Sequence, residues 1–356
     1  MLNRRQMLRY GAGVAAAAVG RRAFPSSPSQ PRPQTGLGMV VYCRGLLEQA
    51  QRRRDPKANL FEPFTFLEHC RQLGAGGVQL PLGTRDEAYA RRLRQQAADC
   101  GMFVEGCVAA PADGADVARF NAEIRTAALV GAATVRTVVF PGRRYEEFDS
   151  AQRFREAFQH ARRSLELAAP VMARHGVRLA VENHKDLRTA EQIELLRRIG
   201  SPWVGACVDV GNNFTLLEDP AQAVEALAPW AFCVHLKDQA AGQYAEGFLY
   251  ADVPLGQGFL DLPRMIAALR KANPAIHFSL ETITRDPLRV PCLAGRYWIT
   301  LGDVPRSDCQ RTLRTVREHR AAELPRISSL SPEERVSREE ANVRAGLAYA
   351  RRRLGI

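Results

Sequence analysis

The chain of 356 residues is predicted to be an α/β protein in which eight parallel strands form a closed barrel. From Gly38 onward, short β-branched runs alternate with stretches of helical periodicity. This alternation is typical of βαβ units and parallel strand pairing. Eight such units predict a (β/α)8 or TIM barrel, in which active sites lie at the carboxyl ends of the strands. A doubly wound open sheet is the alternative, but no G-x-G-x-x-G follows the first strand and no P-loop is present, which removes its commonest ligands.

The eight predicted strands and the helices between them follow in chain order. The strands are expected at Met39–Cys43, Gly77–Leu80, Phe103–Val108, Val135–Phe140, Val177–His184, Val204–Val210, Phe232–Leu236 and Ile276–Glu281. The helices are expected at Pro63–Leu73, Asp86–Cys100, Ala115–Val130, Ala151–His175, Ala190–Ile199 and Leu262–Lys271, where apolar residues recur at helical spacing.

The helix that closes the barrel is expected late, at Ser331–Leu354. Ser331 is a good N-cap, Pro332 suits the first turn, and Glu334 completes a capping box. Residues 282–330 then form an insertion in the eighth βα loop, near the active-site mouth, with a helix predicted at Leu313–Ala322. Loops of this length in compact domains are usually functional or disordered.

The N-terminal segment has the features of an export signal. Residues 1–20 combine the adjacent Arg4 and Arg5 with a short Ala/Gly-rich stretch, which resembles a twin-arginine-type signal; an ordinary basic helix is the alternative. Residues 21–37 form a Pro-rich linker, and residues 38–356 form the barrel. We therefore expect export to the periplasm or another extracytoplasmic compartment, with membrane contact only through an uncleaved signal.

The net charge of +12 comes from the two ends of the chain. Residues 1–34 contain six arginines and no acid, and residues 305–356 contain twelve arginines and seven acids. The stretch between them is nearly neutral, so a nucleic-acid partner is not expected, because such binding needs a basic surface on the folded domain. No apolar run reaches the ~18 residues of a spanning helix, which excludes a polytopic membrane protein.

Four consecutive predicted strands end in an acid or an imidazole. The fifth ends in Glu182-Asn183-His184-Lys185-Asp186, the sixth in Asp209-Val210-Gly211-Asn212, the seventh in His235-Leu236-Lys237-Asp238 and the eighth in Glu281-Thr282. The spacing from Glu182 to Asp209 and from Asp209 to His235 is about one βα repeat, so these side chains are expected on one rim of the barrel.

These residue types together indicate a cation site. Side chains alternate across a strand, so His184 is expected on the side of Glu182, and Lys237 on that of His235. Three carboxylates and one imidazole at a barrel mouth repel one another unless a cation lies between them. Oxygen-rich ligation with one histidine suits Mn²⁺, Mg²⁺ or Co²⁺ better than a thiolate zinc site. The alternative is that each acid caps a helix or pairs with an arginine on its own.

The motifs resemble the sugar phosphate isomerase/epimerase branch of the xylose isomerase-like TIM-barrel superfamily. The similar elements are Glu-Asn-His at 182–184, Asp-Val-Gly-Asn at 209–212, His-Leu-Lys-Asp at 235–238, Pro-Leu-Gly-Gln-Gly at 254–258, and Glu281. The resemblance covers about residues 38–285 and 331–355 and leaves the insertion out.

The resemblance implies that Glu182, Asp209, His235 and Glu281 bind one divalent metal, Mn²⁺ as first choice with Mg²⁺, Co²⁺ or Zn²⁺ as alternatives. It implies that a carboxylate removes the proton next to a substrate carbonyl and that the metal stabilises the enediolate. Glu182 and Glu281 would exchange acid and base roles on opposite sides of the substrate. His184 and Lys237 would contact the substrate or the metal ligands, and Lys237 would stabilise developing negative charge.

Four further residues are expected to contact a carbohydrate substrate: Lys185, Asn212, Asp238 and Trp298. For two of them a structural role is the alternative. Asp238 would orient Lys237 or cap its own loop. Trp298 would form a platform for a sugar or pack the insertion onto the barrel.

The expected function is a metal-dependent isomerase or epimerase of a sugar or keto-sugar. Because the protein is expected to be exported and sugar phosphates are mainly intracellular, the substrate is expected to have no phosphate group. Two departures from the family pattern keep a lyase or dehydratase open. Residues 239–243 lack the arginine that follows the seventh-strand histidine in keto-sugar epimerases, and Asn212 stands where many epimerases have histidine. An exported, non-catalytic sugar-binding protein is the second alternative, an apurinic-site endonuclease is disfavoured by the seven histidines, and homo-oligomerisation is left open.

Overall fold

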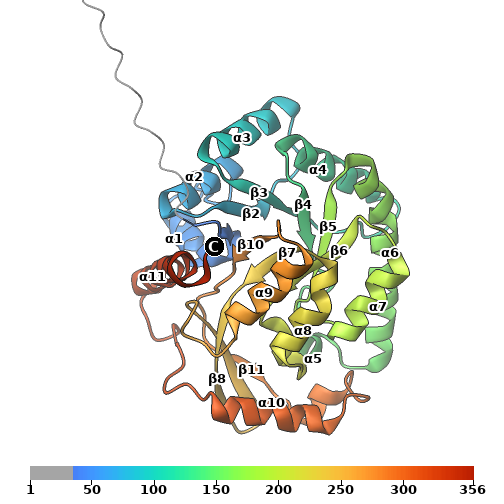
Figure 1. The fold of residues 1–356 in the computed structure, drawn as a ribbon, viewed down its shortest axis with the longest axis vertical. Coiled ribbons are helices and arrows are strands. Elements are labelled where there is room, and N and C mark those ends of the chain that lie inside the picture. Colours follow the sequence, from blue (N-terminus) through green and yellow to red (C-terminus); the bar gives the residue numbers. More distant parts are fainter. Residues whose placement is uncertain (1–34) are drawn as a thin grey trace, which may run out of the picture. The chain divides into compact units, whose positions relative to one another are not determined.

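The computed structural model describes residues 35–356, and its main feature is a closed barrel of eight parallel strands (Figure 1). Around the barrel the strands follow the order β1-β10-β7-β6-β5-β4-β3-β2. They are β1 (Gly38–Val40), β2 (Gly77–Pro81), β3 (Phe103–Cys107), β4 (Thr134–Thr137), β5 (Arg178–Glu182), β6 (Val204–Asp209), β7 (Ala231–Leu236) and β10 (His277–Leu280). The predicted (β/α)8 fold is confirmed. The predicted signal at 1–20 and most of the linker at 21–37 lie outside the described residues.

Helices surround the barrel and alternate with its strands (Figure 1). They are α1 (Gly45–Arg54), α2 (Pro63–Leu73), α3 (Glu87–Cys100), α4 (Val117–Val130), α5 (Arg144–Glu147), α6 (Ala151–His175), α7 (Thr189–Ile199), α8 (Pro220–Leu227) and α9 (Leu262–Ala272). Local chemistry sets their ends. Glu62, for example, accepts a hydrogen bond from the backbone N–H of Thr65 and caps α2, and Gly74, with φ of 81°, ends it.

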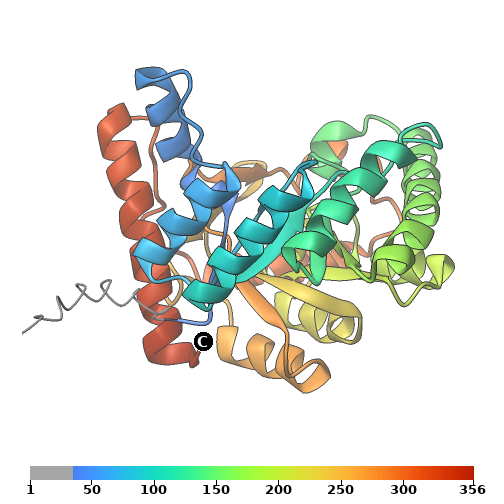
Figure 2. The ribbon, with the colours of Figure 1, turned by 90° about the horizontal axis from the view of Figure 1, so that it is seen from above.

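Helix α11 (Pro332–Tyr349) closes the barrel and runs alongside α1 (Figure 2). Its predicted capping box is present, because Ser331 Oγ accepts from Glu334 N and Ser331 N donates to Glu334 Oε2. Glu339 is buried and accepts hydrogen bonds from the backbone N–H groups of Leu46 and Leu47 at 2.8 and 3.1 Å. Glu339 therefore caps the amino end of α1, where backbone N–H groups have no partner within the helix.

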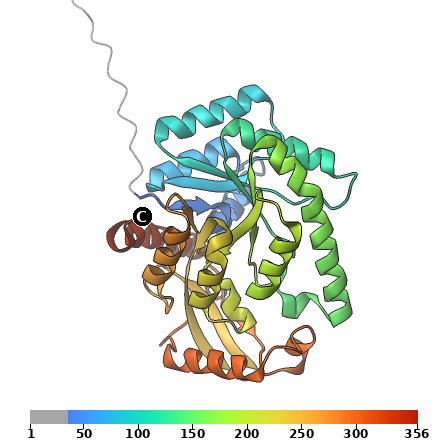
Figure 3. The ribbon, with the colours of Figure 1, turned by 45° about the vertical axis from the view of Figure 1, so that its right-hand side comes forward.

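The seventh and eighth βα loops form a small sheet of their own. Strands β8 (Asp238–Tyr244) and β9 (Gly247–Val253) make a hairpin, and β11 (Leu288–Val290) pairs antiparallel with β9. Helix α10 (Arg306–Glu318) follows and packs on β8, so the helix in the insertion begins seven residues earlier than predicted. Two views show this sheet and α10 together at one end of the molecule, away from α11 (Figures 1 and 3).

Two stacked aromatic rings lie at the amino end of the barrel. Gly38, Gly77, Phe103 and His277 are the first residues of four strands, and the ring centroids of Phe103 and His277 are 4.0 Å apart. A Cβ atom at Gly77 would lie 2.5 Å from the ring of Phe103, so glycine is required where the ring crosses the strand. Within residues 35–356 no helix has the length and apolar character needed to cross a membrane.

Candidate metal centre

Four charged or ionisable side chains converge at the carboxyl ends of four neighbouring strands. Glu182 and Asp209 are the last residues of β5 and β6, His235 lies one residue before the end of β7, and Glu281 follows β10. The register places Asp209 beside His235. One possible ligand atom from each residue lies within 4.8 Å of the others. The structure therefore brings together all four predicted metal ligands.

A hydrogen-bond relay fixes the orientation of the His235 ring. The buried amide of Gln79 donates from Nε2 to Glu105 Oε2 at 2.9 Å, which leaves its Oε1 to accept from His235 Nε2 at 2.7 Å. With the proton on Nε2, the neutral ring has its lone pair on Nδ1. That Nδ1 lies 3.5 Å from Glu182 Oε2 and 3.6 Å from Glu281 Oε2 and makes no hydrogen bond within the described residues.

A lone pair that faces two carboxylates in a buried site needs a positive charge between them. Burial alone lowers the pKa of His235, but Cys207 and the carboxylates of Glu281 and Glu182 outweigh it and raise that pKa well above its ordinary value. A divalent cation bound at Nδ1 would supply the positive charge that these carboxylates favour, as a proton at Nδ1 would. The three carboxylates and one oriented imidazole fit a hard or borderline divalent metal.

Buried cationic side chains pair with the three carboxylates. Lys237 Nζ lies 2.7 Å from Asp209 Oδ2 and 2.6 Å from Glu281 Oε2. Arg136, on β4, donates from Nε to Glu182 Oε2 at 2.5 Å, and a second guanidinium nitrogen contacts the same oxygen. Burial raises the pKa of Asp209 to about 6 despite the opposing effect of Lys237.

The two glutamates differ in how they are held. Both oxygens of Glu182 are engaged, Oε2 by Arg136 and Oε1 by Asn212 Nδ2 at 3.2 Å. Glu281 Oε2 contacts Lys237, whereas its Oε1 has no hydrogen-bond partner among residues 35–356. For both glutamates burial alone raises the pKa, but Arg136 and His235 at Glu182, and Lys237 and His235 at Glu281, outweigh burial and lower it. Glu281 is therefore the carboxylate with an oxygen left to act on a substrate.

Strand β5 ends at Glu182, two residues earlier than predicted, so strand alternation does not place His184. Its Nδ1 makes no hydrogen bond within the described chain, and burial lowers its pKa to about 4, which keeps the ring neutral. Lys185 has a left-handed backbone, with φ of 82°, and its Nζ donates to Asn212 Oδ1. The turn after β5 thus directs Lys185 toward the centre.

The other predicted substrate residues lie in three different settings. Asn212 contacts Glu182, Lys185 and Lys237 and belongs to the centre. The carboxylate of Asp238 accepts from the backbone N–H groups of Gln239, Gly256, Gly258 and Leu260, which favours the loop-capping role. Trp298 is buried in the insertion, donates from Nε1 to Cys292 O and stacks under Arg306. Substrate contacts of these residues stay predictions.

Two residues of the centre were missed by the sequence analysis. Arg136 and Gln79 orient Glu182 and His235 respectively. Each is a polar side chain inside a buried strand, in Thr134–Thr137 and Gly77–Pro81. A polar residue in a buried strand needs a partner, and that was the available signal.

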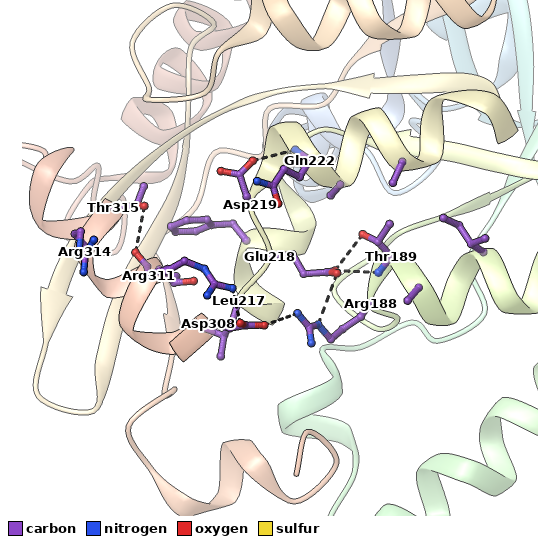
Figure 4. Close-up of a pocket in the computed structure, with 16 residues that line it drawn as sticks. Arg188, Thr189, Leu217, Glu218, Asp219, Gln222, Asp308, Arg311, Arg314 and Thr315 are labelled. Atoms are coloured by element: carbon purple, nitrogen blue, oxygen red, sulfur yellow. Dashed lines mark hydrogen bonds and ion pairs between the residues drawn. The ribbon is translucent and has the colours of Figure 1, made fainter. Parts of the chain in front are cut away.

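A cavity of about 590 Å³ lies where α7, α8 and α10 meet (Figure 4). Arg188 crosses it from Glu218, at 3.7 Å, to Asp308 on α10, at 2.9 Å. Glu218 also accepts from Asn213, which is hydrogen-bonded to Asn183 beside Asp209. A polar network therefore joins this cavity to the back of the metal centre.

A closed barrel with this set of strand-end residues defines a TIM-barrel protein with a candidate metal centre. Residues 67–300 match the xylose isomerase-like TIM barrel family, and the chain belongs to it. The 3-oxo-isoapionate decarboxylase of Pectobacterium atrosepticum is 25% identical over 221 residues, 60% of this chain and 75% of that protein. A putative L-ribulose-5-phosphate 3-epimerase of Haemophilus influenzae is 27% identical over 176 residues, 46% of this chain and 58% of that protein.

Solved structures share the fold at low identity. D-psicose 3-epimerase, determined in the presence of D-fructose, has a TM-score of 0.56 at 16% identity and covers 84% of this chain and 95% of that chain. The 3-keto-D-glucoside 4-epimerase of E. coli, in its apo form, has a TM-score of 0.52 at 15% identity and covers 79% of this chain and 99% of that chain. At these identities the likeness shows the fold alone.

Proposed function

We propose that the protein is a divalent-metal-dependent isomerase or epimerase that moves the proton next to the carbonyl of a non-phosphorylated keto-sugar. The observation that carries this proposal is the convergence of Glu182, Asp209, Glu281 and the oriented His235 within 4.8 Å. Relatives named as epimerases of L-ribulose-5-phosphate and of D-psicose support a sugar substrate, and the absence of a phosphate group rests on the proposed export. A bound divalent ion, with Mn²⁺ the first choice, would polarise the carbonyl and the neighbouring hydroxyl of the substrate.

The proposal assigns the proton transfer to Glu281. Its Oε1 has no partner among the described residues, while Lys237 holds its Oε2 and fixes the carboxylate in place. Removal of a proton next to a carbonyl leaves negative charge on oxygen, and the buried ammonium of Lys237 is placed to stabilise that charge. One carboxylate can return the proton to the neighbouring carbon, which would give isomerisation.

Epimerisation would make a further demand on Glu182. An inversion needs a proton donor on the opposite face of the substrate, and the family resemblance gives that role to Glu182. Arg136 and Asn212 hold both of its oxygens and favour the ionised form. Glu182 would therefore have to loosen from Arg136 in order to bring a proton to the substrate.

The second candidate is a lyase or decarboxylase on the same centre. An elimination or decarboxylation needs only one group that carries a proton. Glu281 could be that group, since Glu182 is held through both of its oxygens. The relative from Pectobacterium atrosepticum, which is named as a decarboxylase, supports this alternative.

The proposed export rests on residues 1–20 and not on the described structure. The twin-arginine-type segment supports a periplasmic or other extracytoplasmic location. That location in turn supports a substrate without a phosphate group.

The first test compares the metal content of the wild type, Glu281→Gln and the exposed control Glu87→Gln by elemental analysis. We expect about one divalent ion per chain in the wild type and in the control, with substantial loss in Glu281→Gln. A wild-type protein that takes up neither Mn²⁺ nor Co²⁺ would contradict the proposal.

The second test follows ketohexoses in D₂O by NMR with the metal-loaded wild type. Deuterium uptake next to the carbonyl with an intact carbon skeleton supports an isomerase or epimerase. Loss of water from the sugar supports the lyase instead, and release of carbon dioxide from a keto-sugar acid in the same assay would indicate a decarboxylase.

A further inference from the structure

Lys185 differs from the other buried cationic side chains in lacking a carboxylate partner. The buried lysines and arginines of the described chain are Arg44, Arg136, Arg144, Lys185 and Lys237. Four of these form ion pairs with glutamate or aspartate. Lys185 is 5% exposed, and its Nζ makes its hydrogen bond to a neutral amide oxygen, Asn212 Oδ1, with no ion pair among residues 35–356.

The protein sustains two costs at this one residue. An ammonium that is buried without an opposite charge is unfavourable. The left-handed backbone of Lys185, with φ of 82°, is unfavourable for a residue with a Cβ atom. Strained conformations of this kind persist where the surrounding structure enforces them and are concentrated at binding and catalytic sites. The two costs together point to an anionic ligand that is brought in from outside.

The position of this ammonium connects it to the metal centre. Asn212 Oδ1 accepts from Lys185 and lies 3.4 Å from Lys237 Nζ, while Asn212 Nδ2 donates to Glu182 Oε1. One amide group therefore separates Lys185 from a predicted metal ligand. Through Asn212 and Lys237, Lys185 is also linked to Glu281.

The charges of the centre point in the same direction. The carboxylates of Glu182, Asp209 and Glu281 are contacted by Arg136 and Lys237 and not by Lys185. Asp252, another buried carboxylate whose charge acts on Lys185, is contacted by Gln239 and Arg285 instead. An anionic group of a substrate would supply the partner that Lys185 lacks, and a neutral sugar would not.

We infer that the substrate is a keto-sugar acid and that Lys185 binds its carboxylate. This inference rests on the proposed function, because it places the carboxylate next to the carbonyl group whose neighbouring carbon loses the proton. It concerns the isomerase or epimerase, since a decarboxylase would instead expel the carboxylate as carbon dioxide and protonate the carbon left behind.

The test compares two ligands that differ in one group. D-Fructose and 2-keto-D-gluconate share a ketone at C2 and the same configuration beyond it, and the second has a carboxylate at C1 where the first has a hydroxymethyl group. Calorimetric titration of the protein, with and without added Mn²⁺, measures both affinities for the wild type, Lys185→Met, Lys185→Arg and the exposed control Lys57→Met. We expect the wild type to bind the acid about 10- to 100-fold more tightly than the ketose.

Lys185→Met should lose this preference for the acid over the ketose, and Lys185→Arg should retain most of it. Lys57→Met should behave as the wild type, and thermal unfolding of each variant shows whether it is folded. Equal affinities in the wild type, no binding of the acid, or a preference that survives in Lys185→Met would each overturn the inference. The last result would assign the preference to chelation by the metal.

The outcome can be separated from that of the proposed function. A preference for the acid that depends on Lys185, in a protein that takes up no metal, would support the anion site and contradict the metal-dependent reaction. Metal uptake and deuterium exchange without any preference for the acid would support the metal-dependent reaction and contradict the anion site.

Discussion

Asp186 is a buried carboxyl group near the centre whose protonation should affect stability. Its Oδ1 accepts from the backbone N–H groups of His184 and Leu187, and its Oδ2 has no partner among residues 35–356. Burial raises its pKa from 3.8 to about 7. The folded protein therefore binds this proton more tightly than the unfolded chain does.

Ionisation of Asp186 at higher pH lowers the free energy of unfolding of the protein. The contribution of Asp186 to stability is complete below about pH 4 and is lost as the pH rises through about 7. Asp186→Asn stays neutral, so its free energy of unfolding relative to the wild type should rise between pH 5 and pH 8, by at least about 1 kcal/mol. Urea unfolding of both proteins at the two pH values measures this change, and a constant difference would show that Asp186 is ionised throughout.

At the scale of single residues, the sequence predicts the four candidate ligands better than the residues that hold them. Glu182 and Asp209 stand out because acids at the ends of successive apolar runs recur at the length of one βα repeat. Arg136 acts from the neighbouring strand β4 and Gln79 from β2 across the barrel, and their partners lie 46 and 156 residues away in sequence. Only the closed barrel reveals such pairs.

Among the elements, the turn before α9 depends on one side chain. Asp238, the first residue of β8, accepts four backbone hydrogen bonds and ties that strand to the Gly256–Gly258 turn. Gly258 has no room for a side chain, because an added Cβ atom would lie 2.1 Å from Asp238 Oδ1. The turn is therefore packed directly on the carboxylate.

Asp238→Ala should destabilise the protein by about 3 kcal/mol, because it leaves buried N–H groups unpaired. Asp238→Asn retains one accepting oxygen, so its free energy of unfolding should lie between those of Asp238→Ala and the wild type. Asp261→Ala is the matched control, since Asp261 caps only the first turn of α9 and should cost about 1 kcal/mol. Chemical unfolding measures all three. An effect on substrate affinity without an effect on stability would assign Asp238 to the substrate instead.

The elements that the sequence analysis missed have weak local signals. Helix α1 is rich in glutamine and arginine, and α8 has only eight residues. Strand β8 contains Ala240, Ala241 and Gly242, which have low β-propensity, and it is held by pairing with β9. The long amphipathic helices α2 and α6 match their predicted limits because their own periodicity and caps define them.

In the whole molecule, Arg144 clamps the insertion to the body of the barrel. Its guanidinium donates from Nε to Thr300 Oγ1 at 3.0 Å, pairs with Glu191 on α7 at 2.6 Å and lies 3.7 Å from the ring centre of Phe154. A second hydrogen bond reaches the carbonyl oxygen of Thr300. One buried side chain thus joins α5, α6, α7 and the insertion.

Arg144→Met should loosen the insertion while the barrel stays folded. We expect faster hydrogen exchange around Thr300 and in α10, with the exchange of β5 to β7 unchanged. Arg143→Met is the matched control, because the ion pair of Arg143 within residues 35–356 is with Glu146, one turn away. Exchange measured by mass spectrometry reads both regions at once, and a uniform increase over the whole chain would instead indicate global destabilisation.

The shared sheet of β8, β9 and β11 also constrains how this protein can be redesigned. Strand β9 is paired on both sides, by β8 and by β11, so removal of residues 282–330 would expose a new sheet edge that contains Phe248 and Tyr250. Exposed edges of this kind promote aggregation. A chimera that exchanges the eighth loop with a relative must therefore transplant residues 238–253 with it, and the two loops are best treated as one interchangeable part.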